Sequence, residues 1–414
     1  MRDCHGKMVL TIGVQNGTAK RNQRKREKGE QQSWKEKHTM SKTYRLGVIG
    51  FAHMHVNGII DSFAALPNVE WVACADTAPT VPSISEESST RKANLKRAHE
   101  HTGIPKVYED YRQMLKQETC DVIIFCPENA RHGEVAEAIA ATGTHMLTEK
   151  PMAASLSEAL RMVRAARAAN VSLMINWPTT WSPAIRKMKS LIDEGVIGNV
   201  WEVKWRNGAS MGPLAYGQQM TDAEKGAEWW HQTAPGGGAL LDYCCYGACL
   251  SRWFIGEPAV AAFGLKANLT SHYGDADDNA IITVRFPKAL TILEGTWTTW
   301  HVGVPTGPIV YGTQGTLVAG SKTIDGRRRQ VVEVYTSRGH GVGEPDQAIE
   351  GDALPQGRTT LAEEFIHHLE TGEPLHPTLD MRFNLEAMAI LDAGIRSAET
   401  GKMELVNDAT WCIG

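Results

Sequence analysis

The sequence predicts an α/β protein in which a doubly wound parallel sheet domain precedes an α+β domain with an open, mainly antiparallel sheet. Three observations lead to this prediction. Apolar strand patterns alternate with helical patterns over residues 43–173, strand-rich segments separated by turns follow over residues 174–414, and 414 residues are too many for one compact core.

The N-terminal half contains the alternating pattern. A first strand is predicted at residues 46–49, followed by a helix that Pro67 ends. Further predictions are a strand at 69–75, a helix stopping near Gly103, a strand at 122–125, a helix at 134–141, a strand at 145–148, and a helix opened by the capping pair Ser155 and Glu158. Strands that alternate with helices favour right-handed crossovers and hence a parallel sheet.

Residues 1–42 differ from the rest, because Lys, Arg, Glu and Gln dominate residues 19–42, where few large apolar groups are available for burial. We expect a disordered tail. The basic run at residues 20–26 could touch nucleic acid, but a solvated tail is favoured. Met40 precedes the first strand, so we hypothesise that the tail comes from an upstream start assignment.

The overall composition points to a small-molecule partner rather than nucleic acid or a membrane, since the formal net charge is only -4. The eight cysteines form no CxxC pair and no compact disulfide framework, which favours a reducing compartment. No apolar run approaches the ~20 residues of a membrane helix. We therefore expect a soluble, cytoplasmic protein.

The turn after the first strand is a candidate dinucleotide site with an incomplete fingerprint. Of the pattern G-x-G-x-x-G only Gly50 is kept, while Ala52 and His55 take the other two places, so this string alone leaves dinucleotide binding open. Asp76 ends the second strand, where a carboxylate can bind an adenosine ribose and repel a 2′-phosphate; the alternative is an aspartate that caps a loop. His53 and His55 lack an evident third ligand, so no metal is predicted.

Several strings together resemble the Gfo/Idh/MocA family of NAD(P)-dependent sugar and polyol oxidoreductases. Glu149-Lys150-Pro151 follows a predicted strand, and Gly236-Gly237-Gly238 leads into Asp242. Further matching strings lie at residues 126–132, 191–198 and 311–317. The resemblance covers residues 45 to about 405 and implies a Rossmann-type first domain that binds NAD(P).

The resemblance implies catalytic roles for Lys150, Asp242 and Tyr246. Most of the family has histidine at the last of these positions, and a tyrosine there looks like the glucose-fructose oxidoreductase and dihydrodiol dehydrogenase branch. Tyrosine has an ordinary pKa of ~10, so we expect the Lys150 ammonium to favour the phenolate that takes the hydroxyl proton. The alternatives are that Lys150 is a surface lysine, that Tyr246 packs in the core beside Tyr243, and that Asp242 caps a helix. For Cys244, Cys245 and Cys249 core packing is favoured over a thiolate site.

The same resemblance implies a cofactor site and a substrate site. The cofactor residues are Gly50, Phe51, Ala52, His53, Met54, His55, Asp76, Pro127, Asn129, His132, Glu149, Lys150 and Pro151. The substrate residues are Lys150, Trp177, Arg206, His231, Asp242 and Tyr246. Asp76 favours NAD over NADP. Two departures stand out: the loop before His132 is one residue longer than the usual family form, and His55 is bulky for a glycine position.

The second domain is predicted to bind the substrate and a second copy of the chain. Its strands are predicted at 200–205, 280–286, 289–297, 309–312 and 331–335, and two closing helices follow, one capped by Thr360 and Glu363 and one carrying Leu385 to Ile395. The resemblance implies a homodimer or homotetramer. Six tryptophans near the expected cleft favour a carbohydrate, because aromatic faces stack on sugar rings: Trp177, Trp181, Trp229, Trp230, Trp297 and Trp300. Core packing is the alternative and explains at least half of them.

Three functions remain open at this point. The first is NAD-dependent oxidation of a secondary hydroxyl of a sugar, glycoside or cyclic polyol, or reduction of the keto form. The second is an NAD-dependent glycoside-cleaving enzyme that oxidises C3 transiently. The third is a non-catalytic homologue, which the incomplete glycine fingerprint and the missing histidine keep open.

Overall fold

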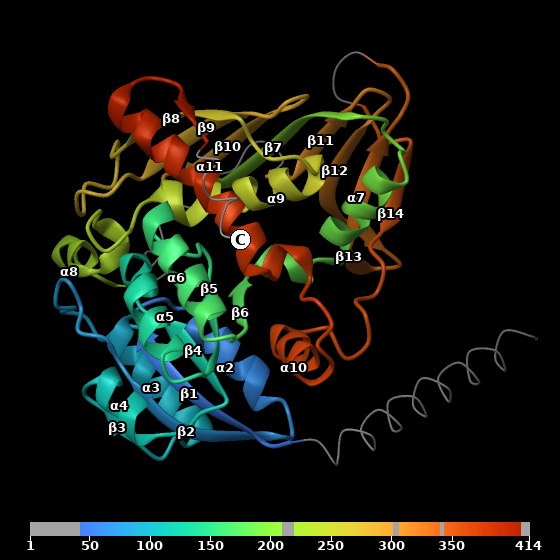
Figure 1. Cartoon of the computed structure of the whole chain (residues 1–414). Coiled ribbons are helices and arrows are strands. Elements are labelled where there is room, and N and C mark those ends of the chain that lie inside the picture. The colour runs from blue at the N-terminus through green and yellow to red at the C-terminus, as the bar shows by residue number, and fades with distance from the viewer. Residues whose placement is uncertain (1–41, 209–218, 301–305, 340–342, 407–414) are drawn as a thin grey trace, which may run out of the picture. The chain divides into compact units, whose positions relative to one another are not determined.

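The structure is a computed structural model that describes residues 42–208, 219–300, 306–339 and 343–406 (Figure 1). Residues 1–41 of the predicted tail lie outside this range. Contacts divide the chain into Met1–Tyr44 and Arg45–Gly414, and the elements discussed below belong to the second unit except for Tyr44, the first residue of the first strand. Across the described residues, no helix has the length and apolar character required to span a bilayer.

The first sheet has six strands in the order β3-β2-β1-β4-β5-β6, and every pair in it is parallel. The strands are β1 (Tyr44–Phe51), β2 (Val69–Ala75), β3 (Val107–Tyr108), β4 (Val122–Cys126), β5 (His145–Glu149) and β6 (Leu173–Asn176). The chain moves outward from β1 to β3 and returns on the other side of β1 at β4. This reversal opens a crevice at the carboxyl ends of β1 and β4, where doubly wound sheets bind ligands.

Five helices cover this sheet: α2 (Val56–Ala64), α3 (Arg91–Thr102), α4 (Tyr111–Gln117), α5 (His132–Ala140) and α6 (Leu156–Ala168). Helix α2 contacts α3, whereas α5 contacts α4 and α6, as expected for helices on opposite faces of the sheet (Figure 1). The predicted cap of α6 is present, since Ser155 Oγ accepts a hydrogen bond from Glu158 N at 3.3 Å. The doubly wound parallel sheet is confirmed.

The second sheet has nine strands in the order β14-β13-β12-β11-β7-β10-β9-β8-β15. They are β7 (Val200–Gly208), β8 (Ala261–Ala267), β9 (Asn279–Arg285), β10 (Leu290–Thr296), β11 (Ile309–Gly312), β12 (Thr316–Ile324), β13 (Arg327–Tyr335), β14 (Gln347–Glu350) and β15 (Glu404–Leu405). Among the described strands β7 and β10 pair in parallel and the other neighbours are antiparallel. The predicted open, mainly antiparallel sheet is therefore confirmed.

Helices cover one face of this sheet. Helix α7 contacts β12, β13 and β14, helix α9 contacts β7 and β10, and helix α11 contacts β8 and β9. The longer helices are α7 (Pro183–Asp193), α8 (Asp222–Ala227), α9 (Cys245–Ile255), α10 (Leu361–Thr371) and α11 (Met381–Thr400). Short 3-10 helices lie at Asn129–Arg131, Pro178–Trp181, Trp229–His231 and Pro377–Leu379, and a π-helical turn lies at Leu240–Cys244.

Helix α11 also contacts the first sheet, through α6 and β6. Its Asn384 accepts a hydrogen bond from the Trp177 indole at 2.6 Å, directly after β6. Strand β6 itself crosses the predicted domain boundary after residue 173, because the apolar run Leu173–Ile175 pairs with β5 instead of joining the second sheet. The C-terminal helix thus joins both sheets into one unit.

Candidate active site

A buried ion pair joins the end of the first sheet to the second half of the chain. Lys150 follows β5, and its Nζ donates to Asp242 Oδ1 at 2.7 Å and to the Asp242 carbonyl at 3.1 Å. Lys150 is 1% exposed and Asp242 is 6% exposed. Burial alone would lower the pKa of Lys150. The attraction of its neighbours, led by the Asp242 carboxylate, outweighs burial and holds the pKa of Lys150 well above its usual value. Lys150 therefore remains an ammonium at neutral pH.

The ring of Tyr246 lies against this pair. Lys150 Nζ is 4.8 Å from the Tyr246 ring centroid, a cation–π contact. The ring also stacks on Trp205 and meets Trp177 edge-on, at centroid distances of 5.5 and 5.4 Å. Burial raises the pKa of Tyr246, and Lys150 opposes this only in part. Lys150 favours the phenolate, as predicted, but the loss of water around the phenol outweighs this charge, so Tyr246 keeps its proton near neutral pH.

The π-helical turn Leu240–Cys244 presents Asp242 to two partners at once. Asp242 Oδ1 accepts a hydrogen bond from Lys150 Nζ, while Oδ2 accepts one from the Trp297 indole at 3.2 Å. The nearby Cys244, Cys245 and Cys249 are buried, and burial raises the pKa of each thiol. Their burial agrees with the packing interpretation of these cysteines.

The glycine turn between β1 and α2 is tight at its one retained glycine. Gly50 has φ +82°, and a Cβ there would lie 2.6 Å from Pro127 N, so a side chain would collide with the backbone of the neighbouring β4 loop. Phe51 and Ala52 are buried. The Ala52 carbonyl accepts from the Trp229 indole at 2.9 Å, and Ala52 and the half-buried Met54 pack with Trp229, Trp230 and Trp297.

His53, His55 and Glu149 lie together, with one ligand atom of each within 4.8 Å of the others. The two histidines are evident from the sequence, but Glu149 was not predicted as the third group, because it is 94 residues from His55. His55 Nδ1 lies 3.2 Å from Glu149 Oε2, and His53 Nδ1 accepts from His55 N at 3.2 Å. In this tautomer His53 Nε2 carries the proton and offers a cation no lone pair. His55 is the N-cap residue immediately before α2, and its side chain is 39% exposed, which accommodates the imidazole at a glycine position.

Asp76 closes β2 as predicted, and its two oxygens differ. Oδ1 accepts from Phe51 N at 3.0 Å, Thr77 N at 2.8 Å and Arg91 Nη1 at 2.6 Å. Within the described residues Oδ2 accepts no hydrogen bond, and the side chain keeps 21% exposure. Asp76 thus holds the glycine turn, which is the loop-capping alternative, and still presents one oxygen outward.

The loop after β4 and the residues after Lys150 form the opposite wall. Asn129 Nδ2 donates to the Gly236 carbonyl at 2.8 Å, and His132 Nδ1 lies 2.9 Å from the Met152 carbonyl. Pro127 and Pro151 are buried. In the described part of the chain, four buried polar atoms of this region have no hydrogen-bond partner: His53 Nε2, Asn129 Oδ1, His132 Nε2 and Trp230 Nε1. Buried polar atoms without partners are rare and expensive in folded proteins.

The substrate candidates do not all meet. Trp177 touches Tyr246, and His231 packs against Trp297 at 5.5 Å between ring centroids. Burial lowers the pKa of His231 to about 4. Arg206 is excluded from this group, because it follows Trp205 on β7 and therefore points to the opposite face of the sheet, where it pairs with Glu294 at 3.3 Å. Trp300 is fully exposed.

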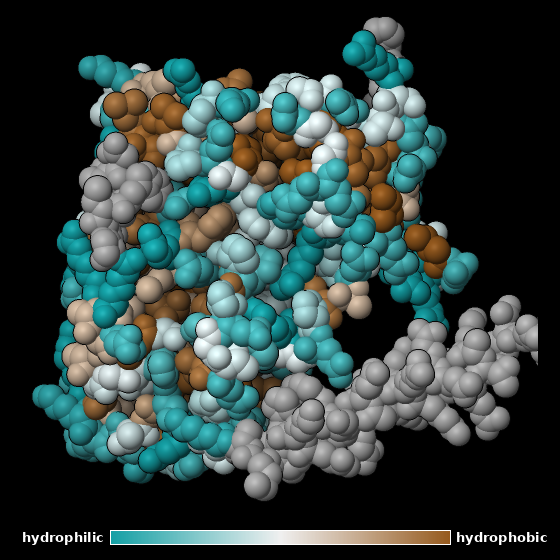
Figure 2. Space-filling model, turned by 45° about the vertical axis from the view of Figure 1, so that its right-hand side comes forward, coloured by the Kyte–Doolittle hydropathy of each residue, from teal (hydrophilic) through white to brown (hydrophobic). Residues whose placement is uncertain are grey.

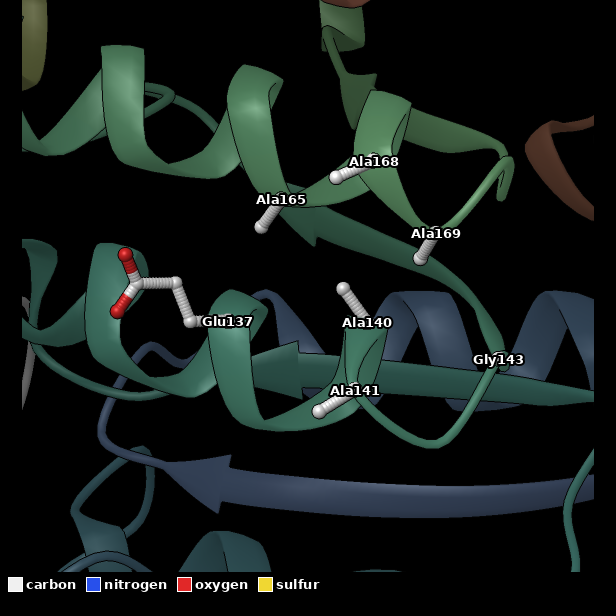
Figure 3. Close-up of a pocket in the computed structure, with 7 residues that line it drawn as sticks. All are labelled: Glu137, Ala140, Ala141, Gly143, Ala165, Ala168 and Ala169. Atoms are coloured by element: carbon white, nitrogen blue, oxygen red, sulfur yellow. The ribbon is translucent and has the colours of Figure 1, made fainter.

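A surface pocket lies apart from these residues. It is lined by Ala140 of α5, Ala141 directly after it, Ala165 and Ala168 of α6, and neighbouring residues (Figure 3). Its one charged side chain, Glu137, binds Arg161. Methyl groups of facing alanines offer no group for acid or base chemistry, so the pocket is not part of the candidate site.

Three residues with functional contacts escaped sequence analysis: Arg91, Glu128 and Trp205. Arg91 donates to Asp76 and to Glu128, and Trp205 stacks on Tyr246. The extra residue in the loop before His132 was the available signal for Glu128. The sequence around Arg91 and Trp205 does not mark either residue as functional. Arg91 follows a polar loop, and Trp205 lies in a strand of ordinary composition.

Comparisons with known proteins agree with this arrangement. Residues 45–177 match the model of an oxidoreductase family with an NAD-binding Rossmann fold, and residues 185–318 match the GFO/IDH/MocA C-terminal domain. A myo-inositol 2-dehydrogenase of Thermotoga maritima is 24% identical over 69% of this chain and 80% of its own length. A levoglucosan dehydrogenase of Pseudarthrobacter phenanthrenivorans is 25% identical over 77% and 87%.

Among solved structures, the WlbA dehydrogenase of Bordetella pertussis in complex with NADH and UDP-GlcNAcA superimposes with a TM-score of 0.65 and 21% identity, covering 89% of this chain and 99% of that one. At 21% identity the match shows a shared fold. Together the two matched models span most of the described chain in the expected order. The chain belongs to the Gfo/Idh/MocA family of oxidoreductases, with an NAD(P)-binding Rossmann fold followed by the family's C-terminal domain.

Proposed function

We propose that the protein is an NAD-dependent oxidoreductase that oxidises a secondary hydroxyl of a sugar, glycoside or cyclic polyol, or reduces the corresponding ketone. One observation carries the proposal: the buried Lys150–Asp242 pair, with Tyr246 against it, lies where the carboxyl end of β5 meets the second half of the chain. The two relatives are named for myo-inositol and levoglucosan, cyclic molecules with several hydroxyl groups.

The crevice residues fit a dinucleotide. The unpartnered His53 Nε2 and Trp230 Nε1 are hydrogen-bond donors in the arrangement described, and donors without partners suit the phosphate and amide oxygens of such a ligand. His132 Nε2 and Asn129 Oδ1 supply acceptors. Asp76 Oδ2 is free for ribose hydroxyls. A bound nicotinamide would supply the hydride chemistry at the substrate carbon.

The protonation of Lys150 and Tyr246 suits the donation of a proton to a carbonyl oxygen. The pKa of Lys150 is held above its usual value mainly by Asp242 against burial, and burial raises the pKa of Tyr246, so both groups carry their protons near neutral pH. We propose that Lys150 polarises the reacting oxygen, that Tyr246 exchanges its proton, and that Asp242 holds Lys150 in place. Oxidation of an alcohol would then become faster as pH rises, because Tyr246 must first lose its proton.

The open face of the nine-stranded sheet is the proposed contact with a second copy of the chain. Strand β9 alternates, with Ala280, Ile282 and Val284 buried and Ile281 exposed. Leu265, Ile281 and Leu290 on β8, β9 and β10 are between 42% and 58% exposed. Hydrophobic groups interrupted by polar ones also gather in the upper part of Figure 2, where this sheet lies. We propose a homodimer or homotetramer, which light scattering of the purified protein would test.

Two further assignments stay proposals. Residues 43–173 are proposed as the dinucleotide domain and 174–414 as the substrate and oligomerisation domain, with β6 belonging to the first sheet. The six cysteines in the described chain are free thiols, which supports a reducing, cytoplasmic compartment.

The first experiment is the thermal shift of the purified protein with NAD+, NADH, NADP+ and NADPH, because a ligand at a hundredfold its dissociation constant adds ~2.7 kcal/mol of stability. We expect shifts with NAD+ and NADH. A screen of sugars and cyclic polyols for NADH release follows, in which accumulation of NADH separates a dehydrogenase from a glycoside-cleaving enzyme. Absence of a shift with all four nucleotides would instead support the non-catalytic homologue.

Lys150→Met tests the site itself. We expect turnover to be lost while NAD+ still shifts the melting temperature. Lys106→Met is the matched control, since Lys106 is an exposed lysine of the same sheet domain, paired with Glu118 at 2.7 Å. Turnover by the Lys150 variant close to wild type would refute the proposed mechanism.

A further inference from the structure

Three charged residues meet beside the glycine turn: Asp76 at the end of β2, Arg91 at the start of α3 and Glu128 after β4. Arg91 Nη1 lies 2.6 Å from Asp76 Oδ1 and 2.8 Å from the Thr77 carbonyl, and Arg91 Nη2 forms a short contact with Glu128 Oε1. Thr77 Oγ1 lies 3.5 Å from Glu128 Oε2. We refer to Asp76, Arg91 and Glu128 as the ribose-end cluster.

The Arg91 side chain is buried within the cluster. Arg91 is 7% exposed and Glu128 is 1% exposed, whereas the Asp76 side chain keeps 21% exposure. Both terminal nitrogens of Arg91 are thus engaged by protein oxygens. To reach an incoming phosphate, the guanidinium would have to leave a buried carboxylate, which would remain unpaired at high cost.

The charges of the cluster do not cancel. Two carboxylates face one guanidinium, which gives a net charge of about -1 when both acids are ionised. An arginine at the end of β2 would by itself attract the 2′-phosphate of NADP, and with Asp76 alone it would leave the region neutral. Glu128 adds the charge that makes this cluster of three residues negative.

We propose that Glu128 is a specificity-determining residue: by holding Arg91 and adding a second carboxylate, it makes this site reject dinucleotides that carry a 2′-phosphate. The inference rests on the proposed cofactor site. It assigns the discrimination between NAD and NADP to the whole ribose-end cluster. In this cluster Asp76 contacts the ribose, and Glu128 binds Arg91 so that the guanidinium cannot reach a 2′-phosphate. The extra residue in the loop after β4 thereby gains a function.

The test is the ratio of the dissociation constants of NADP+ and NAD+, measured by titration calorimetry on wild type, Glu128→Gln, Arg91→Gln and Glu128→Asp. Removing one negative charge near a phosphate should lower this ratio for Glu128→Gln by roughly tenfold or more. Arg91→Gln makes the cluster more negative and should raise the ratio, and Glu128→Asp keeps the charge and should retain the wild-type ratio. Glu137→Gln is the control, an acid paired with Arg161 on the same sheet domain.

The outcomes separate this inference from the proposed function. Binding of NAD+ by wild type together with a lower ratio for Glu128→Gln supports both. Binding of NAD+ with an unchanged ratio in Glu128→Gln and Arg91→Gln overturns the role of Glu128 and leaves the oxidoreductase proposal intact. If Glu128→Gln does not fold, an unchanged or lower ratio in Arg91→Gln overturns the role of the cluster, and a ratio in Glu128→Asp that falls as far as expected for loss of the charge overturns the role of the second carboxylate. Binding of neither nucleotide by folded wild type overturns both.

Discussion

The Lys150–Asp242 pair makes a quantitative prediction about coupling. Lys150→Met leaves the Asp242 carboxylate buried with the Trp297 indole as its remaining side-chain partner, and Asp242→Leu leaves the Lys150 ammonium with a backbone carbonyl at 3.1 Å and the face of the Tyr246 ring. Each single change thus strands a charge that is at most 6% exposed. Breaking a buried pair in this way costs on the order of 3–5 kcal/mol.

The double variant removes both charges, so it should be destabilised by far less than the sum of the two single changes. We expect a coupling free energy of roughly 3 kcal/mol or more from the double-mutant cycle. The assay is urea unfolding followed by tryptophan fluorescence, with the free energy of unfolding compared among the four proteins.

The Lys92–Glu86 pair provides the matched control. Its N–O distance is 3.1 Å, but its side chains are 54% and 77% exposed, so water screens them and the same cycle should give only ~0–1 kcal/mol. If the Lys150–Asp242 changes were additive to within ~0.5 kcal/mol, the buried pair would not hold the two parts of the site together, and the reasoning would fail.

Three further predictions follow from other contacts. Gly50→Ala should destabilise the protein by ~1–3 kcal/mol and abolish the NAD+-induced thermal shift, because φ is +82° and a Cβ would meet Pro127 N; an unchanged shift would contradict the tight turn. Tyr246→Phe should lower kcat by ~10²–10⁴ while the dissociation constant of NAD+ stays the same, and a wild-type kcat would exclude Tyr246 as the proton carrier. Burial lowers the pKa of His132 and of His231 to about 4, below the ~6.5 of an unfolded chain, so the unfolded state alone takes up protons between these values. Each histidine should therefore cost on the order of 3 kcal/mol of stability as pH falls from ~6.5 to ~4, and an His231→Gln variant with the same pH dependence of its urea midpoint as wild type would argue against this.

The fold was predictable where local patterns are strong. Apolar runs such as Val122–Cys126 and the alternation of β9 identify strands directly, because buried parallel strands and half-exposed antiparallel strands have different patterns. The two-residue strand β3 and the short helix α4 were missed, since neither is long enough to show a period. Their positions depend on contacts with β2, which no local window contains.

The site was predictable only in part. The resemblance to the family selected Lys150, Asp242 and Tyr246, but spacing alone could not have paired residues 92 positions apart. The effect of Lys150 on the pKa of Tyr246 was predicted in the right direction, but the larger effect of burial was not predicted, because Trp177 and Trp205 pack against the ring from other elements. Arg206 was misplaced for a related reason: the face of β7 to which it points is fixed by the strand register.

The contacts of helix α11 have a consequence for how the chain folds as it is synthesised. Strand β6 and helix α6 are complete within the first 176 residues, yet the helix that covers them spans Met381–Thr400. A ribosome adds ~5–20 residues per second, so the apolar surfaces of β6 and α6 remain exposed for on the order of ten seconds or more before α11 has been synthesised. During that interval the growing N-terminal half presents an unfinished surface that a chaperone can bind. Truncations near the C-terminus should therefore reduce the yield of folded protein by exposing the first sheet as well as the second.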